Sequence, residues 1–241
     1  MKRVLVTGAT SGIGAAVAER FAAQSAELIL LGRDARKLRA MARALSTRTQ
    51  VRTCVLDLSR RERVAREMVK MARDLPSLDA VIHAAGAFVG GSVLSQDLRS
   101  LDALLAVNVG AAISITRALL RPLEAARGSI IFINSSGVLR PQRLSSLYIA
   151  TKHALKGVAD ALREELNPRG IRVTSVFPGR TATPMQRSVH QLEGRRYVPK
   201  TLLQPADVAE LIACAVNLPE TAELVDAHIR PRRAPPPASS R

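Results

Sequence analysis

The sequence predicts an α/β fold: a Rossmann-type, doubly wound parallel sheet of about seven strands with helices on both faces. Short continuous apolar runs, typical of buried parallel strands, alternate with longer stretches whose apolar residues repeat at helical spacing. A glycine-rich loop also follows the first run directly. The 241 residues suit one domain of ordinary core size, which we place at residues 1–230.

The apolar runs and their local signals place each element in turn. Asp34 is suited to cap the second helix, and Ser59 with Glu62 forms a capping box before the third. Residues 167–170 (Asn-Pro-Arg-Gly) end the long helix expected at 147–166, and Pro205 can open the last helix. Strands are expected at 4–6, 28–31, 51–56, 80–82, 130–133, 173–177 and, more weakly, 224–229; helices at 15–23, 35–45, 61–73, 101–120, 147–166 and 207–216.

The composition limits the classes of function. No apolar run approaches the ~20 residues of a membrane-spanning helix, and Thr7 and Gly8 cut the first run too short for a secretory signal. Cys54 and Cys214 fit no metal-ligand spacing, so we expect no metal site and a cytoplasmic protein. Residues 231–241, rich in Pro, Arg and Ser, predict a disordered tail.

The net charge of +16 leaves two interpretations open. It indicates either a polyanionic partner such as nucleic acid or an Arg-rich solvated surface that also helps to hold a phosphate-rich ligand. The Arg residues are spread along the chain, and aromatic residues, at 2%, are too few to stack on bases. We therefore expect a small-molecule substrate, without a nucleic-acid or membrane partner.

The glycine-rich loop predicts a dinucleotide site. Its glycines allow a tight turn, close approach of the backbone to a pyrophosphate, and close packing of helix on strand. The helix that follows presents its free amides and positive dipole end to the anion. The loop reads Thr7-Gly8-Ala9-Thr10-Ser11-Gly12-Ile13-Gly14, and we assign Gly8, Thr10, Ser11, Gly12, Ile13 and Gly14 to cofactor binding.

The spacing Gly-x-x-x-Gly-x-Gly in this loop resembles that of the short-chain dehydrogenase/reductase family. The resemblance recurs at several separated places along nearly the whole chain. It implies an NAD(P)-dependent oxidoreductase that transfers a hydride between the nicotinamide and a carbonyl or alcohol substrate. A related epimerase or dehydratase activity would use the same residues.

The end of the second strand favours NADP(H) over NAD(H). An acidic residue at this place grips the ribose 2′-hydroxyl of NAD, whereas an Arg suits the 2′-phosphate of NADP. Arg33 stands there and can hold a phosphate through two parallel hydrogen bonds. The resemblance implies that Asp57-Leu58 lies on the adenine side and that Ala84-Ala85-Gly86 lies against the cofactor. His83 replaces the usual Asn of the family and is interpreted as a packed residue.

Tyr148 and Lys152 are the sharpest catalytic signal. Four residues make almost one helical turn, so the two side chains point the same way. A free Tyr has a pKa of ~10, and lowering it to ~7 requires ~4 kcal/mol. A nearby cation lowers such a pKa by ~1–3, so Lys152 and the oxidised nicotinamide together can activate the phenol.

The resemblance completes the site. It implies that Ser135, thirteen residues before Tyr148 and seven after Gly128, orients the substrate oxygen, with Ser136 as the alternative. Asn108 matches the helix Asn that holds a water linked to the Lys. The segment from Pro178 to Thr183 resembles the Pro-Gly-x-x-x-Thr motif, in which Thr183 contacts the nicotinamide amide. Pro178, Gly179 and Thr181 are also assigned to the cofactor.

The substrate region and the assembly leave alternatives open. Residues 186–204 are expected to form a mobile flap whose basic residues either favour an anionic substrate or form a solvated loop. Phe88, Val138 and Leu144 are expected to form an apolar wall. The C-terminal segment lacks the glycines that help many family members to form tetramers, so a homodimer through the helices at 101–120 and 147–166 is expected instead. A catalytically silent NADP-binding regulator and a basic nucleic-acid-binding protein are the rival functions.

Overall fold

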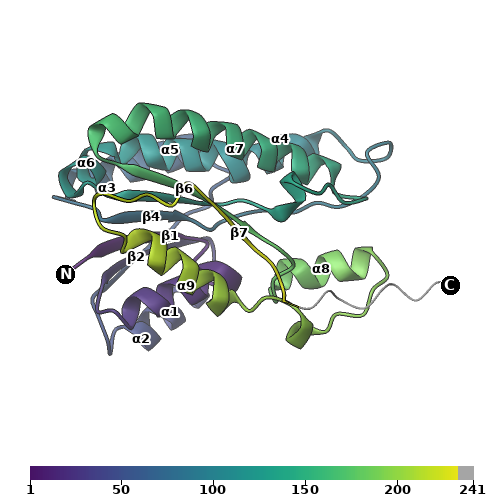
Figure 1. Cartoon of the computed structure of the whole chain (residues 1–241), viewed down its shortest axis with the longest axis horizontal. Helices are drawn as coiled ribbons and strands as arrows, with labels where there is room; N and C mark the ends of the chain where they lie inside the picture. The colour runs from purple at the N-terminus through teal and green to yellow at the C-terminus, as the bar shows by residue number, and fades with distance from the viewer. Residues whose placement is uncertain (233–241) are drawn as a thin grey trace.

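Parallel strands form one seven-stranded sheet in the computed structural model, which describes residues 1–232 (Figure 1). The strand order is β3-β2-β1-β4-β5-β6-β7, which confirms the predicted doubly wound parallel sheet. The order reverses between β1 and β4, and ligands of such sheets bind outside the carboxyl ends of the strands at this point. The strands are β1 (Arg3–Thr7), β2 (Glu27–Gly32), β3 (Val51–Val55), β4 (Ala80–His83), β5 (Ser129–Ile133), β6 (Arg172–Pro178) and β7 (Asp226–Ile229).

Helices cover both faces of the sheet (Figure 1). One face carries α1, α2 and α9, the other carries α3 to α7, and α8 lies beyond the carboxyl ends of the strands. The helices are α1 (Gly12–Ala22), α2 (Ala35–Leu45), α3 (Arg61–Arg73), α4 (Arg99–Leu105), α5 (Ala111–Ala118), α6 (Leu120–Ala126), α7 (Ser146–Leu166), α8 (Pro184–Leu192) and α9 (Pro205–Val216).

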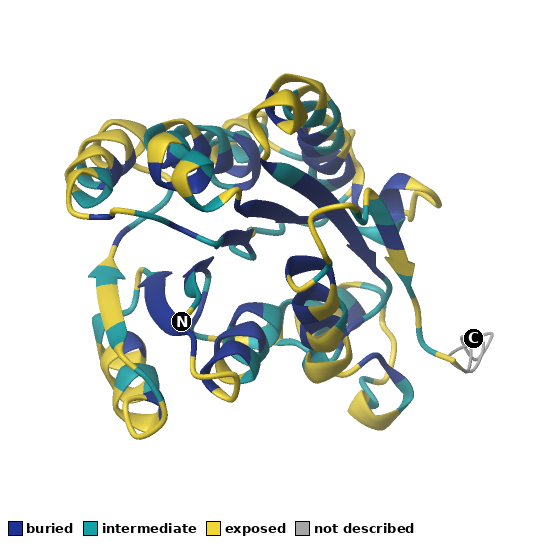
Figure 2. Cartoon of the chain, turned by 60° about the vertical axis from the view of Figure 1, so that its left-hand side comes forward, coloured by how far each residue is buried: buried dark blue, intermediate teal, exposed yellow. Residues whose placement is uncertain are grey.

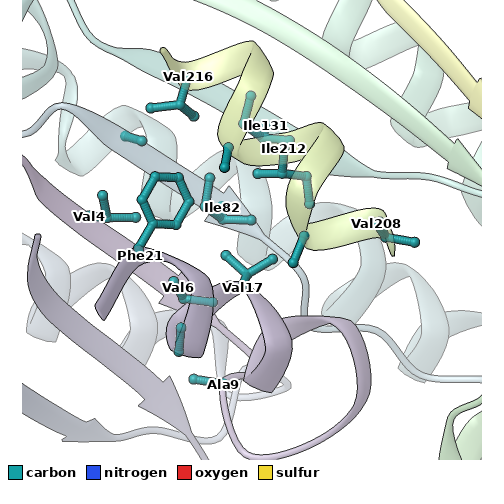
Figure 3. Close-up of a cluster of buried hydrophobic side chains, with 14 of the residues drawn as sticks. Val4, Val6, Ala9, Val17, Phe21, Ile82, Ile131, Val208, Ile212 and Val216 are labelled. Atoms are coloured by element: carbon teal, nitrogen blue, oxygen red, sulfur yellow. The ribbon is translucent and has the colours of Figure 1, made fainter. Parts of the chain in front are cut away.

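Two apolar layers hold the helices to the sheet. Phe21 of α1 and Ile212 of α9 pack over β1 and β4 on one face (Figure 3). Met68 of α3, Ile115 of α5 and Leu155 of α7 pack on the other. Most strands are buried between helices whose outward faces are exposed (Figure 2). The core is mainly aliphatic because the chain has so few aromatic residues.

The observed helix starts test the capping residues predicted from the sequence. Asp34 caps α2, as predicted, by accepting a hydrogen bond of 3.0 Å from the backbone N–H of Lys37. The predicted capping box at Ser59 and Glu62 is wrong. The amide and hydroxyl of Ser59 both donate to Asp57 instead, and α3 begins after Arg60. The capping box that does form lies at Gln204 and Asp207, just before and after Pro205 at the start of α9.

The expected helix at 101–120 is interrupted. A π-helical turn at Ala106–Gly110 separates α4 from α5, and α6 follows as a further short helix. The stretch Arg99–Ala118 is long and apolar enough to cross a membrane by composition, with a mean hydropathy of 1.4. That is weak evidence, because core helices of soluble proteins meet the same criterion, and Ile115 here packs into the core.

The remaining expectations concern the C-terminal part of the chain. The segment predicted as a flap contains a helix, α8, that the sequence analysis missed. A Thr cap at Thr183 followed by Pro184 at the first helical position is the signal that would have found it. Most of the expected disordered tail, residues 233–241, lies outside the described residues.

Candidate active site

A cleft with a volume of about 290 Å³ opens at the carboxyl ends of β1, β4, β5 and β6. These ends flank the point at which the strand order reverses, where ligands of doubly wound sheets bind. Most of the predicted site residues meet here, although they come from distant parts of the sequence. They are Gly8, Ser11, Gly12, Ile13, Ala84, Ala85, Gly86, Ser135, Tyr148, Lys152, Pro178, Gly179, Thr181 and Thr183.

The glycine loop is packed too tightly for side chains. Gly8 has a φ of +65°, and a Cβ there would lie 2.8 Å from the Cα of Ala85. A Cβ on Gly14 would collide with the carbonyl oxygen of Gly8. Ser11 precedes α1 and makes no side-chain cap, so the first backbone N–H groups of α1 stay free for an anion. Gly14 and Thr10 do not line the cleft themselves.

The predicted adenosine end lies outside this cleft. Arg33 follows β2 and is exposed, and its guanidinium makes no hydrogen bond or ion pair within residues 1–232. Asp57 follows the neighbouring strand β3. Hydrogen bonds from Ser59 lower the pKa of the Asp57 carboxyl, and the charge of Arg33 adds to this effect. Leu58 lines a separate, much smaller cavity beside Asn108.

His83 is a packed residue, as interpreted. Its side chain is buried at the end of β4 and stacks on Phe132, with ring centroids 4.9 Å apart. Its Nε2 lies 2.9 Å from Oγ1 of Thr116. Burial lowers the pKa of His83 to about 3, so the ring is neutral at physiological pH.

Tyr148 and Lys152 lie one turn apart at the start of α7. The Nζ of Lys152 is 5.8 Å from the centroid of the Tyr148 ring. Lys152 is buried, and its Nζ donates a hydrogen bond of 2.8 Å to the carbonyl oxygen of Ile133 at the end of β5. The ring of Phe88 meets Tyr148 edge-on, with centroids 5.3 Å apart. Lys152 of α7 and Phe88 of the loop after β4 therefore flank the phenol, and β5 holds Lys152.

The pKa values of this pair differ from the expectation. Burial raises the pKa of Tyr148 to about 12, although a hydrogen bond with the Ser135 hydroxyl partly offsets this rise. Burial lowers the pKa of Lys152 to about 8. The rise for Tyr148 is opposite to the lowering that we expected from Lys152 together with the oxidised nicotinamide, because loss of hydration disfavours the phenolate and only the Ser135 hydrogen bond offsets it. The phenol is thus protonated at neutral pH.

Ser135 is the hydroxyl beside Tyr148. It begins a 3-10 turn, Ser136–Val138, and its Oγ accepts a hydrogen bond of 3.1 Å from the backbone N–H of Gly137. This bond leaves the hydroxyl proton of Ser135 free to point elsewhere. Ser136, the alternative, lines the same cleft, but the hydrogen bond that affects Tyr148 comes from Ser135.

Asn108 lies in the π-helical turn that interrupts the predicted helix. Its Oδ1 accepts from the backbone N–H of Ala87 at 2.7 Å, and its Nδ2 donates to the carbonyl oxygen of Ala87 and to Thr151 Oγ1, both at 3.0 Å. Thr151 in turn donates to the carbonyl oxygen of Tyr148. Asn108 therefore joins the loop after β4 to α7, and π turns are frequent at functional sites.

The substrate wall differs in part from the expected one. Phe88 lines the cleft, but Val138 and Leu144 do not. The first turns of α8 supply apolar side chains that the sequence analysis missed, namely Met185 and Val189. The N-terminus of α8 lies close to the glycine loop, since a Cβ on Gly12 would be 3.0 Å from Cγ2 of Thr183. No cluster of metal-ligating side chains is found in the described part of the chain.

Comparisons with known proteins agree with this geometry. A family model described as short chain dehydrogenase matches residues 2–194. An uncharacterised short-chain type dehydrogenase/reductase of Sinorhizobium fredii is 34% identical over 94% of this chain and 90% of its own. A short-chain dehydrogenase of Burkholderia cenocepacia, solved in complex with NADP, is 31% identical, with a TM-score of 0.83 over 95% of this chain and 96% of its own. A metagenomic short-chain oxidoreductase in complex with NADP is 27% identical, with a TM-score of 0.82 over 96% and 98%.

Proposed function

The chain belongs to the short-chain dehydrogenase family, and we propose that it is an NADP(H)-dependent enzyme that interconverts a ketone or aldehyde and its alcohol. The observation that carries the proposal is the convergence of Tyr148, Ser135 and Lys152 on the cleft that also contains the glycine loop. A cofactor-binding regulator would need the loop but not these three side chains. No feature of the described residues favours nucleic acid as a partner.

The cleft fits a nicotinamide dinucleotide. Gly8 and Gly14 keep the loop free of side chains, and α1 offers free N–H groups for a pyrophosphate. Arg33 is exposed and uncommitted where a 2′-phosphate would lie, which supports NADP(H) rather than NAD(H). Two similar structures, from Burkholderia cenocepacia and a metagenome, were solved with NADP. When bound, NADPH supplies the hydride to the carbonyl carbon.

The chain's own residues handle the substrate oxygen. The Ser135 hydroxyl donates a hydrogen bond to this oxygen and so favours the negative charge that develops on it. The Tyr148 phenol donates its proton to the same oxygen. Lys152, buried beneath the ring and still charged at neutral pH, stabilises the phenolate that this transfer leaves. Asn108 keeps α7 and the loop after β4 in register through its three hydrogen bonds.

The protonation states favour reduction. A phenol with a pKa of about 12 keeps its proton at neutral pH and is ready to give it to an oxygen anion. The same group is a poor base for alcohol oxidation until a further positive charge lies beside it. We therefore expect carbonyl reduction to be the faster direction near neutral pH.

The test is a pair of fluorescence titrations with NADPH and NADH, followed by a screen of aldehydes and ketones. The chain has no Trp, so the fluorescence of the reduced nicotinamide can be followed with little background. We expect tighter binding of NADPH and carbonyl-dependent oxidation of NADPH. Folded protein that binds neither dinucleotide would contradict the proposal. The homodimer, the cytoplasmic location and the single domain over 1–230 stay predictions.

A further inference from the structure

One cationic side chain in the cleft has no part in the proposed chemistry. Among the described residues, the charged side chains that line the cleft are Lys152 and Arg180. Lys152 is committed to Tyr148 and to the carbonyl oxygen of Ile133. Arg180 follows β6 and has a side chain only 16% exposed. Among the described residues no carboxylate lines the cleft, and the carboxylate that pairs with Arg180 lies just outside the lining.

Glu193 is the partner of Arg180. The two guanidinium NH₂ groups donate to the two carboxylate oxygens at 2.8 and 2.7 Å, which is the fork-to-fork arrangement of a bidentate pair. Gln142, from the loop that leads to α7, also accepts from Arg180 at 3.2 Å. Arg180 thus links the segment after β6, the loop that leads to α7 and the far end of α8.

Basic side chains offset an unfavourable position of Glu193, with Arg180 making the shorter contact and Arg195 a longer one of 3.6 Å. Glu193 is the C-cap of α8, where the negative end of the helix dipole repels an anion. The turn itself does not depend on the carboxylate, because the backbone N–H groups of Gly194 and Arg195 already bond the last carbonyls of the helix. The Glu193 side chain is therefore explained by its contact with Arg180 rather than by the helix end.

We propose that Arg180 is the receptor for a carboxylate on the substrate, and that Glu193 occupies this receptor until such a substrate displaces it. The inference rests on the proposed function, since it names the substrate class of the same cleft: an aldehyde or ketone that carries a carboxylate. A substrate carboxylate can make the same two hydrogen bonds to Arg180 that Glu193 makes. Release of Glu193 would free the end of α8 to adjust over the bound substrate.

The charge of the two segments that carry Gln142 and Arg180 agrees with an anionic substrate. The cleft-lining segments and their continuations, residues 139–145 and 180–200, contain seven basic residues and one acidic residue, Glu193 itself. Such a field raises the local concentration of small anions. Phe88, Ile149 and Val189 give the rest of the cleft an apolar lining. The site thus suits a compact molecule with an apolar body and one anionic end.

The test compares two aldehydes of similar shape, para-formylbenzoate and its neutral methyl ester, with NADPH as the reductant. For each enzyme the measured quantity is the ratio of kcat/KM for the anion to kcat/KM for the ester. We expect the wild-type protein to favour the anion. Arg180→Gln is expected to lower the ratio by about tenfold to hundredfold, as loss of a charge-assisted pair does. Arg180→Lys, which keeps the charge but not the fork, should fall between them.

Glu193→Gln distinguishes a substrate-binding role of Arg180 from a structural clasp, that is, an Arg180–Glu193 ion pair that only holds α8 in place. It removes the competing carboxylate, so the receptor proposal expects the ratio to rise, opposite to the effect of Arg180→Gln. A clasp that only holds α8 in place would make both variants move the ratio in the same direction or leave it unchanged, which would overturn the proposal. Arg195→Gln is the matched control, because Arg195 also lies 3.6 Å from Glu193 but is exposed and outside the cleft.

A calorimetric titration of para-formylbenzoate into each protein saturated with NADP distinguishes failure of the Arg180 receptor from failure of the proposed reaction. Binding that depends on Arg180 without any turnover would support the receptor and count against the proposed reaction. Turnover of both aldehydes with a ratio that Arg180→Gln leaves unchanged would overturn the receptor alone. Absence of both binding and turnover would also overturn it. Melting temperatures of all variants exclude misfolding as the cause of any loss.

Discussion

The two sides of the cleft present different groups, backbone on one side and side chains on the other. The cofactor side, residues 7–14 and 84–86, offers mainly backbone, and its glycines exclude side chains. The proposed catalytic and substrate side, residues 135–152 and 178–193, offers side chains that loops and helix ends bring together. Binding through backbone groups requires the loop to keep its position. It does not depend on the chemistry of the side chains on the other side of the cleft. The two sides should therefore fail independently when they are mutated, one losing binding and the other losing turnover.

Apart from loss of the Tyr148 hydroxyl, the largest effect is expected on the proposed catalytic side, at Ser135. Ser135→Ala removes the hydroxyl beside Tyr148 and should lower kcat by about 10²–10³-fold, as loss of a hydrogen-bond donor to a developing oxyanion does. Ser136→Ala is the matched control, since Ser136 lines the same cleft, and should change kcat far less. Steady-state kinetics with NADPH measure both. A larger loss of kcat in Ser136→Ala than in Ser135→Ala would instead assign the hydrogen bond to the substrate oxygen to Ser136.

A mutation on the cofactor side is expected to weaken cofactor binding. Arg33→Ala removes the exposed guanidinium after β2 and should weaken NADPH binding by about tenfold to hundredfold. Binding of NADH, which has no 2′-phosphate, should be almost unchanged. Fluorescence titrations with both dinucleotides measure the effect. Equal weakening for NADPH and NADH would show that Arg33 supports the fold of this side rather than the phosphate.

The pH dependence of reduction should report Lys152. Its pKa of about 8 means that the charge is present below that pH and is lost as the pH rises. The Tyr148 proton remains bound until a pKa of about 12, so it does not limit the rate in this range. We expect kcat for reduction to be level below about pH 8 and to fall by up to about tenfold for each further pH unit. A rate that stays constant to about pH 10 would contradict this role of Lys152.

The smallest effect is expected where the two sides meet, at Asn108. Asn108→Ala leaves the backbone groups of Ala87 and the Thr151 hydroxyl without their partner, which should cost about 1–3 kcal/mol of stability. Thermal or denaturant unfolding measures this loss, and kcat should fall only a few-fold if positioning is the whole role. A loss of kcat as large as that of Ser135→Ala, at unchanged stability, would instead make Asn108 a direct participant.

The same contrast explains what the sequence could predict. The strands, the sheet and the glycine loop depend on local patterns of apolar residues and glycines, and the structure confirms them. The break at Ala106–Gly110 was missed because a π turn keeps the apolar spacing of a helix on either side. The capping box at Ser59 failed because the carboxylate of Asp57, two residues earlier, competes for the same hydroxyl and amide.

The charges of the site were the hardest part to predict. Spacing placed Tyr148 beside Lys152, but it could not give the burial that raises the pKa of the phenol. Nor could it show that Arg180 meets Glu193, thirteen residues later, across the start and end of α8. Both depend on tertiary packing, which sets hydration and long-range pairing. The basic residues of segment 186–204 were expected either to favour an anionic substrate or to form a solvated loop. None of them lines the cleft, whereas Arg180, just before the segment, does.

The most direct test of the central claim is one preparation of Tyr148→Phe measured in two ways. The variant keeps the ring that packs against Phe88 and removes only the hydroxyl. We expect kcat for carbonyl reduction to fall by about 10²–10⁴-fold, as loss of a general acid does, while the Kd for NADPH stays within about twofold of wild type. Near-normal turnover, or a loss of NADPH binding that parallels the loss of turnover, would contradict the account.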